Sequence, residues 1–118
     1  FLDDSKKPQV SPDCSVKKAI MEISEKRLGV TAVIENEKIL GIITDGDIRR
    51  MLNRTDDFIA LQAKDIMSVN PKMVKSTAMA IEALEMLEQY SITQLVVADN
   101  EKYLGIIHLH DLLKEGIV

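Results

Sequence analysis

The sequence predicts a mixed α/β (α+β) fold in which two β-α-β-β-α units pack about a pseudo-twofold axis. The main observation is an internal repeat: "VIENEKILGIITDGD" (33–47) matches "VADNEKYLGIIHLHD" (97–111) without a gap, 64 positions later. The second observation is that each copy changes from helical to strand periodicity in the same order. Each predicted unit, 1–57 and 58–118, is so small that an independent core is marginal, so we expect the two units to bury apolar surface against each other.

The first copy opens with a short β-prone piece, "PQV" (8–10), followed by a helix over 15–28. Strands are predicted over 30–35 and 38–44, on either side of the turn-like "ENEK", and a second helix starts near Asp45, a good N-cap residue. Apolar residues of the first helix recur at the spacing of a single stripe, at Val16, Ala19, Ile20 and Ile23.

The second copy repeats this order of elements. Between the copies, 58–71 is apolar enough to pack against the fold, and "DIM" (65–67) is predicted as a short helical turn that ends before Pro71. The predicted elements are a β-prone piece over 72–74, a helix over 78–90, strands over 93–99 and 103–108, and a last helix starting near His110 or Asp111.

Composition excludes several kinds of partner. With a formal net charge of −4 and only 3% aromatic residues, we expect neither nucleic-acid binding nor binding to an anionic membrane. No apolar run reaches the length of a membrane span and no signal peptide opens the sequence, so we expect a cytoplasmic protein. The single cysteine, Cys14, fits a reducing compartment and is expected to be a half-buried filler near a helix start. Because the sequence begins at Phe1 rather than Met, we also expect a fragment of a longer chain.

The repeated "GIITDGD" (41–47) combines three features that suit a nucleotide. Gly41 permits either close approach of another backbone or a local bend, and Thr44 ends the strand where a helix begins. A helix N-terminus attracts phosphate, and the Asp47 carboxylate is an acceptor for the two hydroxyls of a ribose. The alternative is that Thr44 and Asp47 only cap the helix. The recurrence of the aspartate as Asp111 favours ligand binding, since capping does not require it in both copies.

These motifs resemble the CBS domain pair, a regulatory module that binds adenosine nucleotides and related ligands in clefts between its repeats. The ligand motif of that family is Gly-apolar-x-Ser/Thr-x-x-Asp, which Gly41, Thr44 and Asp47 match fully. The second copy keeps Gly105 and Asp111 but has His108 where Ser or Thr is expected. The resemblance implies two related clefts, and a difference in ligand chemistry between them.

A narrower resemblance is to the C-terminal region of D-arabinose-5-phosphate isomerases. It is carried by "GIITDGDIRRML", "SITQLVVAD" and the final "LGIIHLHDLLKEGIV". The resemblance implies that a sugar isomerase domain precedes this chain in the parent protein, which acts in Kdo biosynthesis for lipopolysaccharide or capsule. The chain itself would then be a regulatory region without catalytic residues.

His108 and His110 have three interpretations. On a strand, the spacing of two residues points both side chains to the same face. They could form half of a metal site, although only Asp111 lies near them in sequence. They could be a solvated strand end, or they could line the second cleft and donate to an acidic ligand. The last interpretation, together with the family resemblance, favours CMP-Kdo as the effector, because CMP-Kdo carries both a phosphate and a sugar carboxylate.

Further candidates for contact with a ligand lie just after Asp47 and at the starts of the middle strands. Arg49 could point to an anion in a cleft or lie on the surface, while Arg50 could pair with Asp47 one helical turn away. Thr31, Thr93 and Gln94 begin the middle strands, where CBS modules often contact the base, although all three are also ordinary strand residues.

The favoured function is a ligand-sensing module that binds a nucleotide-type effector, with CMP-Kdo preferred and an adenine nucleotide as the alternative. A structural dimerisation unit is the alternative from another class, and we expect CBS pairs to self-associate as dimers, with a tetramer possible for the parent. We expect no cofactor and no metal. The chain has neither a Walker loop nor a Ser/His/Asp set, so enzyme activity of the fragment itself is not expected.

Overall fold

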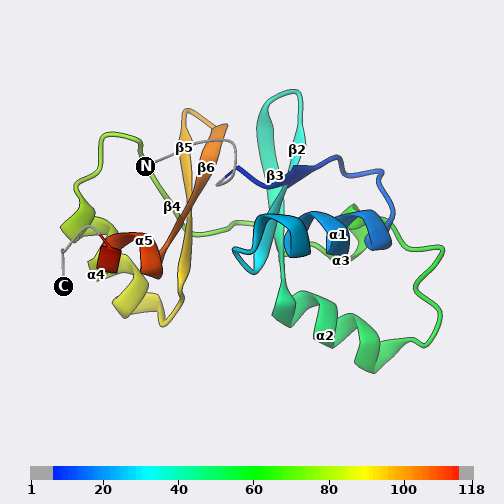
Figure 1. The fold of residues 1–118 in the computed structure, drawn as a ribbon. Helices are drawn as coiled ribbons and strands as arrows, with labels where there is room; N and C mark the ends of the chain where they lie inside the picture. Colours follow the sequence, from blue (N-terminus) through cyan, green and yellow to red (C-terminus); the bar gives the residue numbers. More distant parts are fainter. Residues whose placement is uncertain (1–6, 115–118) are drawn as a thin grey trace.

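The computed structural model describes residues 7–114, so residues 1–6 and 115–118, at the outer ends of the two predicted units, lie outside the described residues. Two halves of similar construction lie side by side, one from each sequence repeat (Figure 1). The predicted mixed α/β architecture and the order β-α-β-β-α in each copy are confirmed. No helix among the described residues has the length and apolar character needed to cross a bilayer.

The first half forms its elements for local reasons that are visible in the sequence. The first helix begins after Ser15, whose side chain accepts a hydrogen bond from the Lys18 amide, and ends at Arg27, which has a left-handed backbone (φ 60°). The elements are β1 (Gln9–Val10), α1 (Val16–Lys26), β2 (Val30–Glu35), β3 (Lys38–Thr44) and α2 (Asp45–Arg54). The connection to the second half contains the short helix α3 (Ala63–Ile66), two residues earlier than the predicted turn at 65–67.

The second half repeats the arrangement with β4 (Met73–Val74), α4 (Ala80–Tyr90), β5 (Gln94–Asp99), β6 (Lys102–His108) and α5 (Leu109–Lys114). The last helix begins at Leu109, earlier than the predicted start at His110 or Asp111. The reason is that the Asp111 carboxylate accepts the His108 amide at 3.0 Å, which caps the helix from within its first turn.

Both hairpins turn at the residues that the sequence marks as turns. Asn36 and Glu37 in the first hairpin, and Asn100 and Glu101 in the second, all have positive φ angles. Two successive residues with positive φ form the type of tight turn that matches the twist of antiparallel strands. The repeat therefore extends to the backbone conformation of single residues.

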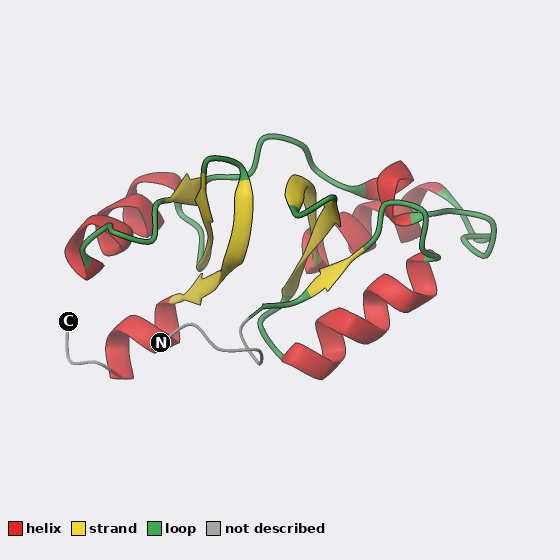
Figure 2. Ribbon diagram, turned by 90° about the horizontal axis from the view of Figure 1, so that it is seen from above, coloured by secondary structure: helices red, strands yellow, loops and turns green. Residues whose placement is uncertain are grey.

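The strands are arranged in the order β1-β2-β3-β6-β5-β4. The two halves join edge to edge through one residue pair, Lys38 with Lys102, so the sheets of the two halves are continuous at a single point. Elsewhere their inner faces pack against each other, with the helices on the outer faces (Figure 2). The core between the halves consists of Val30, Ala32, Val96, Ala98, Tyr103 and Ile106.

Two side-chain hydrogen bonds also tie the halves together. The buried Tyr103 hydroxyl donates to the Pro8 carbonyl at 2.7 Å, and burial raises the pKa of this phenol further above its ordinary value. The Gln94 side-chain amide donates to the Leu28 carbonyl at 2.8 Å. Each bond joins a residue of one copy to the other, which fixes the angle between the halves.

The segment after α3 is a strap over the first half, because Ser68 exchanges two backbone hydrogen bonds with Ile42 (2.8 and 2.9 Å). A Cβ atom on Gly41 would lie 2.6 Å from the Ser68 carbonyl oxygen. Gly41 is therefore required for the strap to approach β3, which confirms the close backbone approach predicted at this glycine.

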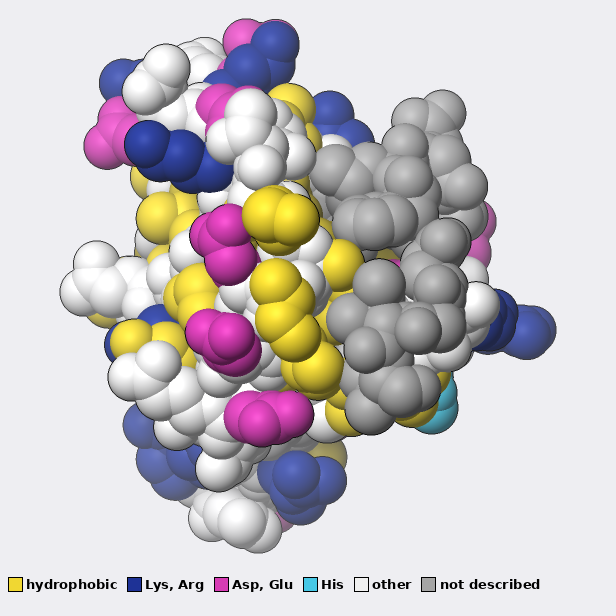
Figure 3. Space-filling view, turned by 90° about the vertical axis from the view of Figure 1, so that its left-hand side faces the viewer, with side chains coloured by type: hydrophobic (Ala, Val, Ile, Leu, Met, Phe, Trp, Pro, Cys, Tyr) yellow, Lys and Arg dark blue, Asp and Glu magenta, His cyan; other side chains and the backbone are white. Residues whose placement is uncertain are grey.

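The outer end of the second half is amphipathic. Figure 3 looks onto this end, where apolar side chains form a band beside a row of acidic side chains. Met79, Ile81 and Leu113 of this half are between 44% and 66% exposed. Exposed apolar groups of this kind are candidates for contact with another protein surface.

We expect Gly41→Ala to lower the free energy of unfolding by about 1–3 kcal/mol, because the new methyl group forces the strap away from β3. Gly46→Ala is the control: a Cβ there meets nothing closer than 3.4 Å, and alanine in a helix is favoured over glycine by about 0.5–1 kcal/mol. Urea denaturation of both variants tests this expectation. Equal stabilities for the two variants would contradict the assignment of Gly41 to the strap.

Candidate functional site

The first candidate site lies where β3 ends and α2 begins. The Thr44 amide donates to the Asp47 carboxylate at 2.9 Å, and the Asp47 amide donates to the Thr44 hydroxyl oxygen at 3.2 Å. This reciprocal pair is a capping box, so the capping role considered for these two residues is present. The Thr44 hydroxyl also lies 3.1 Å from the carboxylate.

The Asp47 carboxylate has two more partners. Arg50 donates to one oxygen, as the sequence spacing predicted, and the Ser68 hydroxyl donates to the same oxygen at 2.7 Å. Asp47 is only 6% exposed, and burial raises its pKa, but the hydrogen bonds from Thr44, Ser68 and Arg50 outweigh burial and hold the pKa below its usual range. Both oxygens are therefore already engaged, and a ribose would have to displace Arg50 or Ser68 to reach them.

A cavity of about 210 Å³ lies beside this network and is called the first cleft. Its walls come from both halves and are mostly apolar, with Lys72 and Gln94 as polar groups next to Thr44 and Ser68. A narrow apolar slot between two sheets suits a flat ring, such as a nucleobase. The apolar lining residues include Val30, Ile42, Ile92, Leu95, Val96 and Ile106.

His108 and His110 occupy the corresponding place in the second half. Their rings are stacked, with centroids 4.8 Å apart and planes 5° from parallel. The His110 amide donates to His108 Nδ1 at 3.1 Å, so Nδ1 is an acceptor and the proton of the neutral ring lies on Nε2. The premise that both histidines lie on a strand is wrong: His110 is in α5, because the chain enters the helix directly after His108.

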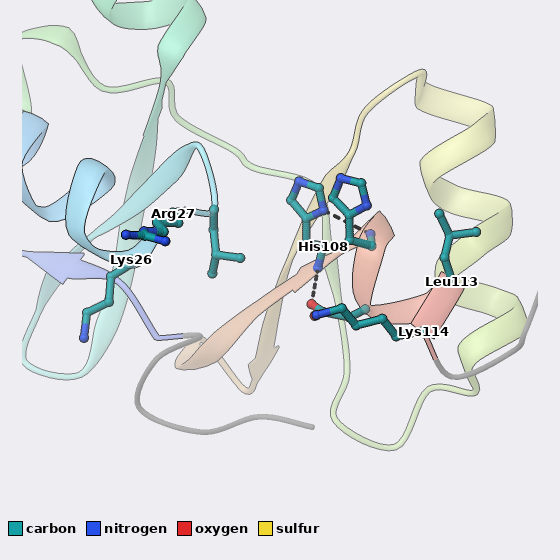
Figure 4. Close-up of a pocket in the computed structure, with 8 residues that line it drawn as sticks. Lys26, Arg27, His108, Leu113 and Lys114 are labelled. Atoms are coloured by element: carbon teal, nitrogen blue, oxygen red, sulfur yellow. Dashed lines mark hydrogen bonds between the residues drawn. The ribbon is translucent and has the colours of Figure 1, made fainter.

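The two histidines line a cavity of about 530 Å³ between the halves, which is called the second cleft (Figure 4). Lys26, Arg27 and Leu28 come from the end of α1, while Asp111, Leu113 and Lys114 come from α5. A neighbouring hollow extends the cleft past His108 to Gly29, Asp45 and Gln94. The second cleft is thus wider and more basic than the first.

The structure separates the other predicted residues. Gln94 lies between the clefts and lines both, whereas Arg49 is exposed and lines neither. Thr31 is fully buried, and its hydroxyl donates to the Ala32 carbonyl at 3.3 Å, within its own strand. Thr93 is exposed, and its carbonyl accepts the Leu109 amide at 2.8 Å. Of these four, only Gln94 is brought to a cavity.

Sequence reasoning missed Ser68 and three cations, Lys26, Arg27 and Lys114. Gly41 is the sequence signal that could have pointed to Ser68, because a glycine that allows close backbone approach implies that another segment packs there. The cations gave no signal, since ends of surface helices commonly carry lysine and arginine. Among residues 7–114, no group of three metal-ligating side chains is present, so a metal site at the histidines has no further ligand there.

We expect Asp47→Asn to lower the free energy of unfolding by about 2 kcal/mol at neutral pH. The asparagine NH2 group would take the place of one carboxylate oxygen and would face the donors of Thr44, or those of Arg50 and Ser68, without accepting from them. Since the folded-state pKa of Asp47 is lowered, the stabilisation is present above about pH 4 and is lost as pH falls through the folded-state value. The difference between wild type and variant should therefore shrink on acidification. Denaturation curves between neutral pH and pH 3 measure it.

Asp45→Asn is the matched control, because Asp45 is an exposed residue in the first turn of the same helix. It should cost less than about 1 kcal/mol, from the helix dipole alone. A pH-independent loss in Asp47→Asn, equal to that in the control, would contradict the carboxylate network.

Comparison with known proteins places these features in a family. Two arabinose 5-phosphate isomerases named KdsD are similar in sequence: one from Francisella tularensis is 48% identical over 91% of this chain, and one from Escherichia coli K12 is 38% identical over 94% of it. This chain spans about a third of the length of these relatives (33% and 34%).

Solved structures share the fold. An uncharacterised conserved protein from Pyrococcus horikoshii superposes with a TM-score of 0.82 at 24% identity, covering 98% of this chain and 88% of its own. A CBS domain protein from Pyrobaculum aerophilum, complexed with AMP, superposes with a TM-score of 0.78 at 18% identity, covering 96% and 93%. The CBS domain profile matches residues 4–54 and again residues 63–117. The chain therefore belongs to the CBS domain family and carries two copies of that domain.

Proposed function

We propose that this chain is the regulatory region of an arabinose-5-phosphate isomerase and binds a nucleotide-type effector in its second cleft. The observation that carries the proposal is the stacked pair His108 and His110 on the wall of a 530 Å³ cavity between the two CBS copies. That volume lies within the range of about 300–1,000 Å³ that is usual for small-molecule sites. The similarity to two KdsD isomerases supports the proposal that the parent protein is an arabinose-5-phosphate isomerase.

CMP-Kdo is the preferred effector. His108 replaces the threonine that the first copy has at Thr44, and its Nε2–H is a donor that a carboxylate accepts. A ligand with a phosphate and a sugar carboxylate uses the histidines and the neighbouring cations together. Asp111 and Gln94 complete the polar groups of this cleft. The parent isomerase would respond in the cytoplasm to an activated sugar of its own pathway.

An adenine nucleotide in the first cleft is the second candidate. The first copy keeps the complete motif Gly41, Thr44 and Asp47, next to an apolar slot between the sheets. The Pyrobaculum aerophilum protein of the same fold is complexed with AMP. Binding there requires Asp47 to exchange Arg50 or Ser68 for ribose hydroxyls. The contacts with Thr31, Thr93 and Arg49 proposed from sequence remain predictions.

Calorimetric titration with CMP-Kdo, CMP, AMP and ATP tests both candidates. We expect CMP-Kdo to bind more tightly than CMP, and His108→Ala to remove about tenfold in CMP-Kdo affinity while changing CMP affinity less, because only CMP-Kdo has the sugar carboxylate. CMP is thus the control ligand: a substitution that disturbed the fold would weaken the binding of CMP as much as that of CMP-Kdo. Binding of AMP or ATP without CMP-Kdo would favour the second candidate, and silence from all four ligands would reject both.

Self-association is also part of the proposal, with the exposed apolar band of the second half as the contact surface. We expect sedimentation equilibrium to show a dimer, and Ile81→Glu to weaken it about tenfold, since a charge in an apolar contact is costly. Ile59→Glu is the control: Ile59 is 85% exposed but lies in the connecting loop. A monomeric wild type, or equal weakening by both substitutions, would contradict this assignment.

A further inference from the structure

The outer surface of the second half carries a row of acidic side chains. The row lies on α4, where glutamates recur at every third residue and therefore stand on one side of the helix: Glu82, Glu85 and Glu88. All three are exposed, and α4 contains no lysine or arginine. Figure 3 shows a row of this kind beside the apolar band. The three glutamates and the band residues Met79, Ile81 and Leu113 are called the acidic face.

An apolar hollow opens next to this row, between α4 and α5. It has a volume of about 260 Å³, and its apolar walls are Leu84, Leu87, Ile92, Leu109 and Leu113. Glu88 also lines it. Because Glu88 and Leu113 belong to both the hollow and the acidic face, this surface offers a recess for an apolar side chain together with negative charge.

The internal repeat places the opposite charge at the same positions of the first half. Lys18 lies 64 positions before Glu82. In the same way, Arg49 corresponds to Leu113. The first helix, α1, has three lysines against two glutamates, and α2 has three arginines against two aspartates. Five exposed residues of these two helices are called the basic face: Lys17, Lys18, Met21, Arg49 and Leu52.

Electrostatics distinguishes two ways of pairing two copies of the chain. When second half meets second half, the glutamates of both copies lie opposite each other, and juxtaposed like charges oppose association. When second half meets first half, the glutamates lie opposite the cations of the basic face, and the two faces attract each other. A twofold axis makes this unlike contact twice, once with each half. The assembly then closes as a dimer in which the two chains run antiparallel.

We propose that the acidic face binds the basic face of a second copy of this chain, so that two copies associate antiparallel. The inference rests on the self-association in the proposed function and adds which two surfaces meet. Met21 and Leu52 are 61% and 49% exposed, and they supply the apolar side chains that cover the band and the hollow. The charged residues around them fix the orientation of the partner.

Charge reversal on each face, followed by sedimentation equilibrium, tests the orientation. We expect the double variant Glu85→Lys, Glu88→Lys to weaken the dimer at least about tenfold, because it sets positive charge against the basic face. The double variant Lys17→Glu, Lys18→Glu should weaken it as much, for the converse reason. All four substitutions in one chain restore opposite charges, so the affinity should return to within about threefold of wild type. This recovery also shows that neither pair of substitutions prevents folding.

The control variant Glu35→Lys, Glu37→Lys makes the same change of charge at exposed positions on the tip of the hairpin between β2 and β3. This tip is at the top of Figure 1, whereas α2 lies at the bottom. The control should keep the affinity of wild type within about twofold. Raising the salt concentration should weaken the wild-type dimer, because salt screens attraction between unlike faces. A dimer of like faces would instead be strengthened by salt, and that result would overturn the inference.

The same measurements separate this inference from the proposed function. If wild type, both double variants and the combined variant dimerise equally, self-association stands and the antiparallel pairing is rejected, since like faces carry like charge in all four proteins. A monomeric wild type rejects both. If the combined variant recovers the dimer while no nucleotide binds, the pairing stands and the nucleotide function is rejected.

Discussion

The packing of the two inner sheet faces against each other is the interaction on which the rest of this structure depends. The helices of each half cover only one face of its three strands, so the other face stays exposed unless the second half covers it. Val30, Ala32, Val96 and Ile106 meet there with Tyr103. The strands of the two halves join edge to edge at only one residue pair. Side-chain packing and the side-chain hydrogen bonds of Gln94 and Tyr103 add to this junction. Both clefts lie between these halves, and their shape follows from this packing.

The two copies have the same backbone arrangement around their clefts, but the side chains that line the clefts differ. In the first cleft, the Asp47 carboxylate accepts hydrogen bonds from its own half and from the strap. The cavity beside it is small and mostly apolar. In the second, His108 takes the place of the capping threonine, and cations stand around a larger space. The equivalent aspartates keep the capping role, since each accepts the backbone amide at the end of its strand (Thr44 and His108). The aspartates are thus the same in both copies, and the side chains beside them differ.

Sequence patterns were sufficient for the elements and insufficient for the sites. The repeat, the apolar stripe of α1 and the "ENEK" and "DNEK" turns predicted the fold, because local preferences decide those features. The sequence predicts Thr31 as a candidate ligand residue, but its side chain is fully buried, because strand alternation does not tell which face of a strand the other half covers. The lining of the second cleft could not be predicted, because Arg27 and Lys114 come from different halves and line one cavity only in the folded arrangement of the two halves. His110 lines the second cleft from α5 and not from a strand, so the argument from strand spacing does not apply to it.

The position of Gln94 has a consequence for occupancy. Its side chain lines the first cleft and the hollow that extends the second. Its side-chain amide donates a hydrogen bond to the Leu28 carbonyl, between α1 and β2. A ligand in either cleft that takes this amide releases the carbonyl at the edge of the other. Two ligands that compete for this one polar group would obey reciprocal linkage: whatever the first did to the affinity of the second, the second would do equally to the first. A module that bound ligands in this way would report a combination of two concentrations rather than either one alone.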